Sequence, residues 1–260
     1  MKKLLFIPLL LLTIKAIACD CEEPDIIERY MQADFVASVQ IVKNYPNEGE
    51  EGLYRSDIRI RKLFKGESIP SLHVAGRYDN DSLGVVSTCD IFIPENTELV
   101  VYAYLNQKGQ YTIGMCSGLL YLKENGDQRQ IAYQEKELKI LKTLKDLRLG
   151  DAANIDYWRY DLYSADLDNS LDQLRDMALE KVFGLYAMNF NRDLTLDSVE
   201  VLSGFNRTLD TKLVGILKNS NWSKQLSNEE IHPEERKQLI GIYYYEAERG
   251  NPSFLSIYYL

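Results

Sequence analysis

Histidine is scarce in this chain, and so are the short motifs that assemble a catalytic site. The two histidines, His73 and His232, lie far apart in the sequence, and neither stands beside a Cys or Ser motif. The chain contains no nucleophile elbow, no phosphate-binding loop and no His-Glu-x-x-His zinc motif. We therefore expect a protein that is not an enzyme and that needs no cofactor and no metal of its own.

Positive charge is also in short supply. The chain has 39 acidic residues against 30 lysines and arginines, which gives a formal net charge of −9 at pH 7. Lys2, Lys3 and Lys15 lie in the first 18 residues, so removal of that segment would change the charge from −9 to −12. Such an acidic chain repels phosphate backbones, and nucleic acid is therefore not expected as a partner.

Long apolar runs are absent except at the start of the chain. Residues 4–12 are apolar, follow two lysines, and precede the small-residue sequence Ala16-Ile17-Ala18. The run is shorter than the roughly 20 residues that a bilayer span needs. This pattern is typical of a secretory signal peptide, residues 1–18. We expect an exported protein of the bacterial periplasm, the outer envelope or the extracellular space, with no membrane span once the leader is cleaved.

The chain has only four cysteines, namely Cys19, Cys21, Cys89 and Cys116. An even number of cysteines in an exported protein predicts disulfide bonds. Cys19 and Cys21 are too close in sequence to bridge each other without strain. The remaining possibilities are Cys19–Cys89 with Cys21–Cys116, or the crossed pairing. A zinc site is not expected, because Cys-x-Cys lacks the usual spacing of zinc ligands.

Cleavage after Ala18 would make Cys19 the first residue of the mature protein. Its free α-amine and its carbonyl oxygen could then chelate one metal ion, provided that disulfides hold the residue still. The cysteines could instead be purely structural. Lipidation of Cys19 is a further alternative, but Ala16 replaces the larger apolar residue of a lipidation signal. We favour the unlipidated form, which leaves the amine free.

The mature start resembles the amino-terminal, netrin-like domain of tissue inhibitors of metalloproteinases. The resemblance covers roughly residues 19–125 and rests on the Cys-x-Cys start and on an Ala-Asp-apolar stretch at residues 31–39. It implies an OB-type five-stranded barrel with the bridges Cys19–Cys89 and Cys21–Cys116. It also implies that the Cys19 amine and carbonyl bind the zinc of a partner protease, with Asp20 beside them.

Some residues depart from the pattern of these inhibitors. Met31 stands where the family has a further cysteine, and the partner of that cysteine is absent too. Asp20 stands where the inhibitors place a small residue that enters the protease pocket, and Glu22 and Glu23 add charge nearby. A carboxylate is costly to desolvate without a partner. The resemblance therefore supports the fold more strongly than it supports inhibition.

Periodicity along residues 25–148 agrees with a small barrel and a covering helix. In the second strand, Ile58, Ile60 and Phe64 are expected to point inward. The Lys108-Gly109 pair predicts a hairpin turn, and Gly150 is a plausible end of the covering helix. The expected elements are a helix at 25–32, strands at 35–42, 54–64, 71–75, 99–105 and 111–115, and a helix at 130–148.

The last third of the chain resembles the carboxy-terminal domain of TonB. This second resemblance covers about residues 180–248 and rests on a strand, a turn, a strand, a Leu209-Asp210 helix start, Trp222 and a final strand. It implies a small sheet with a helix on one face, whose edge could accept another chain. The expected elements are a helix at 167–179, strands at 182–190, 195–203 and 238–246, and a helix from 209 to 218.

We thus expect a mainly β plus α protein. The predicted parts are a signal peptide (1–18), an inhibitor-like OB-fold domain with a covering helix (19–149), a helical linker (150–180) and a TonB-like β-β-α-β domain (181–260). The expected function is that of a secreted or cell-envelope protein that binds another protein. The alternative is a true metalloendopeptidase inhibitor, which would meet the zinc of its partner through Cys19 and Asp20.

Overall fold

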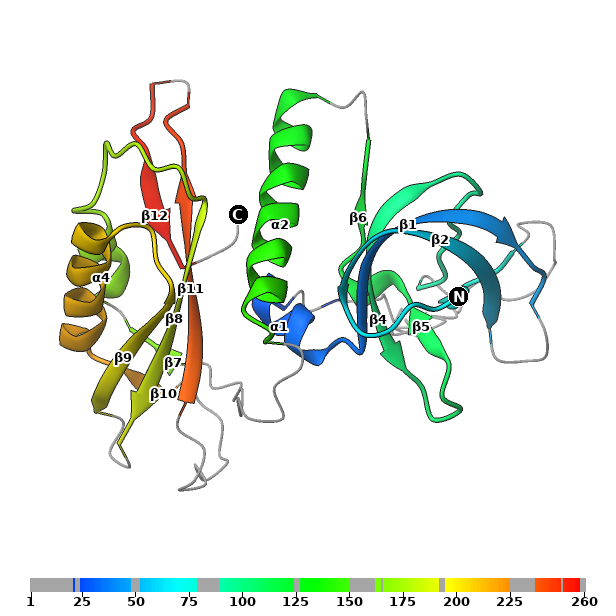
Figure 1. Ribbon diagram of the computed structural model, residues 1–260, viewed down its shortest axis with the longest axis horizontal. Coiled ribbons are helices and arrows are strands. Elements are labelled where there is room, and N and C mark those ends of the chain that lie inside the picture. Colours follow the sequence, from blue (N-terminus) through cyan, green and yellow to red (C-terminus); the bar gives the residue numbers. More distant parts are fainter. Residues whose placement is uncertain are drawn as a thin grey trace, which may run out of the picture.

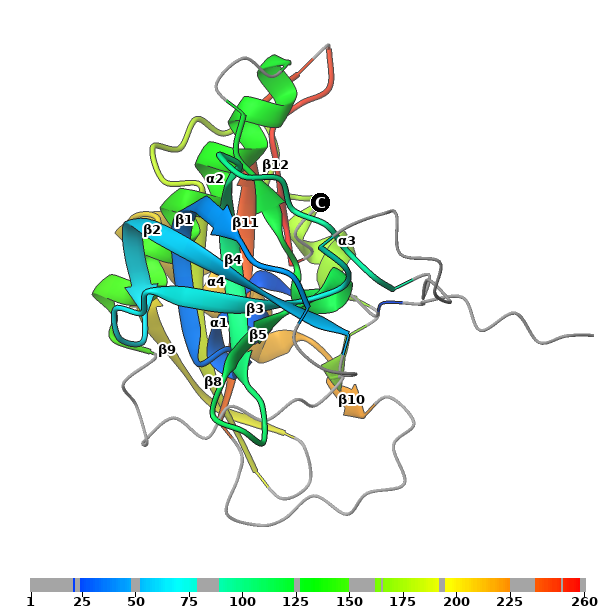
Figure 2. The same ribbon diagram turned by 90° about the vertical axis from the view of Figure 1, so that its right-hand side faces the viewer.

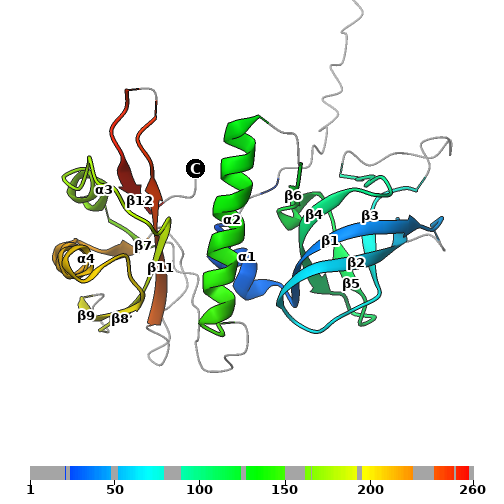
Figure 3. The same ribbon diagram turned by 45° about the horizontal axis from the view of Figure 1, so that its top comes forward.

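The described part of the chain forms three layers along the longest axis of the molecule. A β-barrel lies at one end, two helices lie in the middle, and a sheet backed by a further helix lies at the other end (Figure 1). Figure 3 shows the same order of layers from another direction. The computed structural model describes residues 21, 24–47, 52–78, 89–123, 127–149, 162–164, 166–191, 195–224, 237–248 and 250–257.

The barrel is closed and has the strand order β1-β2-β3-β5-β4, with β4 pairing back to β1. β3 and β5 run parallel, and the other neighbours run antiparallel. This is the OB-like five-stranded barrel that the sequence predicts, and Figure 2 shows its strands in front of the rest of the molecule. The strands are β1 (Phe35–Asn44), β2 (Leu53–Lys65), β3 (Ser71–Ala75), β4 (Glu98–Leu105) and β5 (Tyr111–Ile113), and β6 (Leu120–Tyr121) pairs with the outer part of β4.

Alternate residues of the barrel strands fill its interior. Phe35, Ala37, Val39 and Ile41 of β1 are all buried there, as strand periodicity predicts. Ile58 and Ile60 of β2 also point inward, but the expectation for Phe64 was wrong.

A bulge in β2 explains the position of Phe64. Ser38 pairs with Lys62 whereas Val39 pairs with Ile60, which leaves Arg61 as an extra residue. One extra residue reverses the inward and outward alternation of the strand beyond it. Phe64 therefore lies outside the barrel, where it packs against the middle helices.

The middle layer consists of α1 (Ile26–Gln32) and α2 (Gln128–Asp146), close to the two helices expected there. Asp127 caps the start of α2, and its carboxylate accepts a hydrogen bond of 2.6 Å from the Arg129 N–H. Both helices are apolar on the side of the barrel and on the side of the far sheet. Their fully buried apolar residues are Ile26, Ile27, Tyr30, Ile140, Leu141 and Leu144.

The far sheet has the strand order β12-β11-β8-β9, and all of its neighbouring strands are antiparallel. Its central strand β8 is buried on both faces. Phe183, Leu185 and Ala187 face α1 and α2, whereas Tyr186 and Met188 face α4. The elements are β8 (Phe183–Phe190), β9 (Leu196–Ser203), α4 (Arg207–Asn219), β11 (Lys237–Tyr245) and β12 (Phe254–Ser256).

Residues on both sides of the expected boundaries at 149 and 181 share one apolar core. Side chains of the barrel, of both middle helices and of β8 and β11 all belong to it. The barrel and the far sheet are therefore two ends of one packed body.

The helix expected at 167–179 was wrong in length, because α3 covers only Leu167–Leu171. After Leu171, hydrogen bonds to a distant part of the chain hold the backbone in a conformation that is not helical. The Asp176 N–H donates to the Ser253 carbonyl (3.1 Å) and the Met177 N–H donates to Ser253 Oγ (2.8 Å). A short ladder of β7 (Leu162–Tyr163) with β10 (Ser223–Lys224) and the strand β12 were not expected from the sequence.

Candidate functional site

The segments that carry Cys89 and Cys116 meet at the carboxyl end of β3. Val74 pairs with Ile113 of β5, and a Cβ placed on the next residue of that segment, Gly114, would lie 3.2 Å from the Ala75 Cβ. On the other side, the Ile91 N–H donates a hydrogen bond of 3.1 Å to the Ala75 carbonyl. The fold therefore brings the two later cysteines to the same end of the barrel.

A close approach at Gly76 holds the Cys89 segment in place. Gly76 has a φ of +155°, and a Cβ at this position would lie 2.0 Å from the Ile91 carbonyl oxygen. Only glycine fits such a contact. The Gly76 carbonyl accepts a hydrogen bond of 2.8 Å from the Asn47 side chain, which also holds the backbone at this close contact.

A buried polar chain fixes the same segment at Ile93. The Ile93 N–H donates to Tyr54 Oη (2.8 Å), and the Ile93 carbonyl accepts from Asn44 Nδ2 (2.8 Å). Ser56 donates to Asn44 Oδ1 (2.6 Å), which completes the bonding of the amide. Burial raises the pKa of Tyr54 to about 12, so this phenol stays protonated at neutral pH. Residues 89–93 are thus held on a rigid support.

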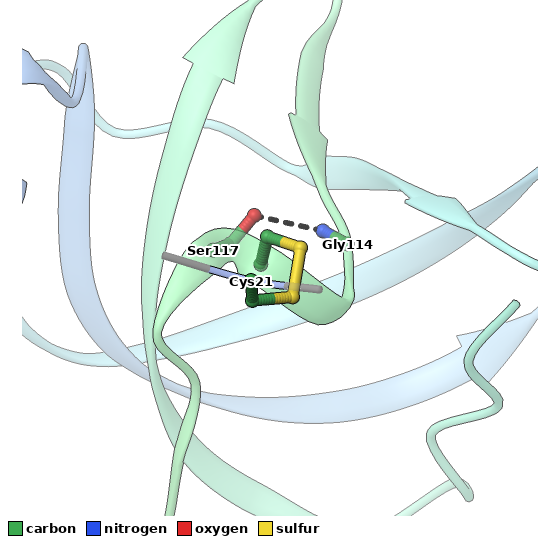
Figure 4. Close-up of a disulfide and its surroundings, with 4 residues drawn as sticks. Cys21, Gly114 and Ser117 are labelled. Atoms are coloured by element: carbon green, nitrogen blue, oxygen red, sulfur yellow. Dashed lines mark hydrogen bonds between the residues drawn. A yellow bond between two sulfur atoms is a disulfide. The ribbon is translucent and has the colours of Figure 1, made fainter. Parts of the chain in front are cut away.

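Cys116 lies in the 3₁₀ helix η1 (Met115–Ser117), which follows β5. The Gly114 N–H donates a hydrogen bond of 2.8 Å to Ser117 Oγ and so stabilises this turn (Figure 4). Cys116 forms a disulfide with Cys21, with the two Cα atoms 5.2 Å apart. This bond confirms one predicted bridge and excludes the crossed pairing.

The second predicted bridge is only partly within the described residues. Cys89 is disulfide-bonded, but Cys19, the partner predicted for it, lies outside the described residues. Asp20, Glu22 and Glu23 lie outside them as well, so the proposed contact of Cys19 and Asp20 with a zinc ion stays a prediction.

A buried polar cluster connects the turn at Cys116 to the middle helices. Arg29 of α1 donates from Nη1 to the Gly118 carbonyl (3.0 Å), and its guanidinium lies 4.9 Å from the centroid of the Tyr102 ring. Tyr102 Oη donates to Glu137 Oε1 of α2 (2.7 Å), and Arg29 Nη2 lies 4.0 Å from Glu137 Oε2. Burial raises the pKa of Glu137, although Arg29 and the Tyr102 hydroxyl act in the opposite direction.

Gly118 is required for this arrangement. It has a left-handed φ of +70°, and a Cβ there would lie 2.4 Å from Arg29 Nη1. The Arg29 guanidinium can therefore reach the backbone two residues after Cys116.

Exposed apolar side chains flank the two cysteine segments. Met115, beside Cys116, is 48% exposed, and Phe92, on the Cys89 segment, is 44% exposed. The Phe92 ring lies 6.2 Å from Tyr54 and 6.5 Å from Tyr78 between ring centroids. Neither flanking residue was predicted from the sequence. The available signal was that Met115 directly precedes Cys116 and that Phe92 follows Cys89 by three residues.

Of the two histidines, His73 lies within the described residues, and it belongs to no group of metal-binding side chains there. His73 lies on β3 with its Nε2 atom 3.3 Å from Gln110 Nε2, and His232 is outside the described residues. Across the described ranges, no three His, Cys, Asp or Glu side chains are grouped so that they could hold a metal ion. Among the described helices, none has the length and apolar character needed to span a bilayer.

Comparison with known proteins adds no assignment. A scan against protein-family models finds no match to the chain, and a search of curated proteins finds none either.

Proposed function

We propose that this protein is an exported binding protein that is not an enzyme and that contacts another protein through the barrel end where Cys21 is bridged to Cys116. The observation that carries the proposal is the meeting of the Cys89 and Cys116 segments at the end of β3. Cys21 is bridged to Cys116 of one segment, and Cys89 of the other segment is also disulfide-bonded. The family resemblance of the mature start agrees with this use of the barrel end.

The physical advantage of the site is its rigidity. A segment that is ordered before binding loses less conformational entropy when a partner binds. Hydrogen bonds at Gly76 and Ile93 hold one side of the site, and the disulfide with its turn holds the other. Met115 and Phe92 supply exposed apolar area on these supports, as the anchor residues of protein interfaces do.

Site-specific photo-crosslinking tests this proposal. A photoreactive amino acid is placed at Met115, at Phe92 or, as the control, at Val201, an apolar residue of β9 that is 40% exposed. We expect the protein exported by its native host to capture the same partner from positions 115 and 92 and not from 201. Equal capture from all three positions, or from 201 alone, would contradict the proposed surface.

The second candidate function is inhibition of a zinc metalloprotease through the Cys19 amine and carbonyl. The bridge at Cys21 favours it, because it fixes the chain close to the predicted mature terminus. Asp20 argues against it, since its carboxylate would have to be desolvated at the protease. One alanine added before Cys19 separates the two functions. Inhibition of a metalloprotease panel should be lost with this extension, whereas crosslinking from Met115 should be unchanged if inhibition is not the function.

A further inference from the structure

A carboxylate next to the bridged segment is bonded to the far sheet. Asp25 lies just before α1, and both of its oxygens accept from Tyr243 Oη of β11, at 2.6 Å and 3.0 Å. The two residues are 218 positions apart in the sequence, and Tyr243 is completely buried. Burial raises the pKa of Asp25, although the hydrogen bond from Tyr243 acts in the opposite direction.

Close packing accompanies this hydrogen bond. A Cβ on Gly241 would lie 2.7 Å from Ile27 Cδ1 and 2.8 Å from Phe183 Cε2. The missing side chain therefore lets α1 lie directly on β11 and β8. The Phe183 and Tyr243 rings pack with their centroids 5.2 Å apart beneath the same helix.

The other contacts of α1 lead back to the disulfide and to the barrel. Arg29 donates to the Gly118 carbonyl next to η1, and Lys65 Nζ of β2 donates to the Tyr30 and Met31 carbonyls at 3.0 Å and 2.8 Å. The start of α1 thus depends on the far sheet, its middle on the turn that carries Cys116, and its end on β2. A shift of β11 changes the first of these contacts directly.

We infer that Tyr243 is a positioning residue, through which the carboxy-terminal sheet orients the amino-terminal segment of the binding site. The inference rests on the proposed function for its biological meaning. It makes the docking of the sheet and the binding of a partner thermodynamically coupled, because Asp25 and α1 contact both the sheet and the turn that carries Cys116. The sheet then acts as part of the site's support, and α1 is the physical link between them.

The test compares two tyrosines that are neighbours on β11. Tyr243→Phe removes the hydroxyl that Asp25 accepts. Tyr244→Phe removes a hydroxyl that donates to the Met177 carbonyl (2.6 Å) on the opposite face of the same sheet. The two changes delete the same atom from the same strand, so they differ chiefly in the face that loses its hydrogen bond.

Two measurements on the folded, oxidised full chain report the state of the segment. They are amide hydrogen exchange in α1 and the rate at which dithiothreitol opens the Cys21–Cys116 disulfide. We expect Tyr243→Phe to raise both rates about tenfold, the size expected for loss of a buried hydrogen bond to a carboxylate. Tyr244→Phe should leave both within about twofold and should raise exchange near Met177 instead.

Equal effects of the two variants would show a general loss of stability and would overturn the inference. Unchanged rates in Tyr243→Phe would overturn it too. Asp25→Asn removes one of the two acceptors from the other side of the bond, and it should change both rates in the same direction as Tyr243→Phe. Neither measurement uses a partner, so these results judge the positioning role alone, whereas the crosslinking contrast between Met115 and Val201 judges the proposed function.

Discussion

Replacement of Cys21 and Cys116 by serine should lower the free energy of unfolding by several kcal/mol. The two residues are 95 positions apart. In the chain-entropy description of cross-links, a loop of this length contributes about 4.7 kcal/mol when it is the only one. If the predicted Cys19–Cys89 bridge is also present, the loop that Cys21–Cys116 newly closes contains only about 30 residues, and its contribution falls to about 3.6 kcal/mol.

Denaturation by guanidinium chloride under non-reducing conditions measures this contribution. Cys116 is exposed and Cys21 is half-buried, so the serine side chains themselves remove little buried surface. The variant should show a lower midpoint and a larger m-value, because the unfolded chain without the cross-link exposes more surface. A parallel measurement starts from a chain in which Cys19 and Cys89 are already serine.

The comparison of the two backgrounds tests the second bridge. Loss of Cys21–Cys116 should cost about 1 kcal/mol more when Cys19 and Cys89 are serine, because the remaining cross-link then closes the longer loop. Equal losses in both backgrounds would contradict the Cys19–Cys89 pairing. A loss below about 1 kcal/mol with an unchanged m-value would refute the view that the disulfide restrains the chain.

Two further predictions concern the packing around the middle helices. Gly241→Ala should destabilise the protein by about 1–3 kcal/mol, because the new methyl group would press on Ile27 and Phe183. Its control, Gly215→Ala in α4, should stabilise the protein by about 0.5–1 kcal/mol, since no atom lies within 4 Å of a Cβ at this position and alanine favours a helix. Urea denaturation measures both changes in the free energy of unfolding, and changes of the same sign would refute the packing argument. Burial lowers the pKa of Lys136 to about 7, beneath the ring of Tyr245 at 3.1 Å from its centroid. Between pH 7 and 9 the unfolded chain then binds more protons than the folded chain, so the free energy of unfolding should rise with pH across this range. Lys136→Met should reduce this rise. An unchanged dependence of the free energy of unfolding on pH, measured by urea denaturation, would exclude Lys136 as its source.

Local chemistry made much of the barrel predictable from the sequence. Alternation in residues 35–42 and the β-forming run at 99–105 identified strands that the structure contains. The cysteines alone left two pairings open, and the bridge between Cys21 and Cys116 was implied by the family resemblance. Hydrophobic alternation describes the residues of one strand at a time. It therefore could not anticipate the bulge at Arg61, which depends on how β1 and β2 pair, and this is why Phe64 was placed on the wrong face.

The contacts that support the candidate site were beyond sequence reasoning for a related reason. Tyr243 lies in a run of three tyrosines that reads as an ordinary strand, and only the folded structure puts its hydroxyl on Asp25. In the sequence, Gly241 is only a residue that weakens a strand, whereas the structure shows that its missing side chain makes room for Ile27. The shortening of α3 likewise follows from hydrogen bonds to Ser253, more than 70 residues later.

The position of the middle helices between two β layers also sets the order in which the protein can fold. α1 leaves the ribosome long before β11, the strand that covers it, because about 200 residues separate the two elements. Until β11 arrives, Ile27 and its neighbours have no apolar surface to cover them on that side, which is the kind of exposure that invites aggregation. The nascent chain therefore exposes this apolar surface until β11 has been synthesised, and a fragment that stops after α2 would expose it permanently.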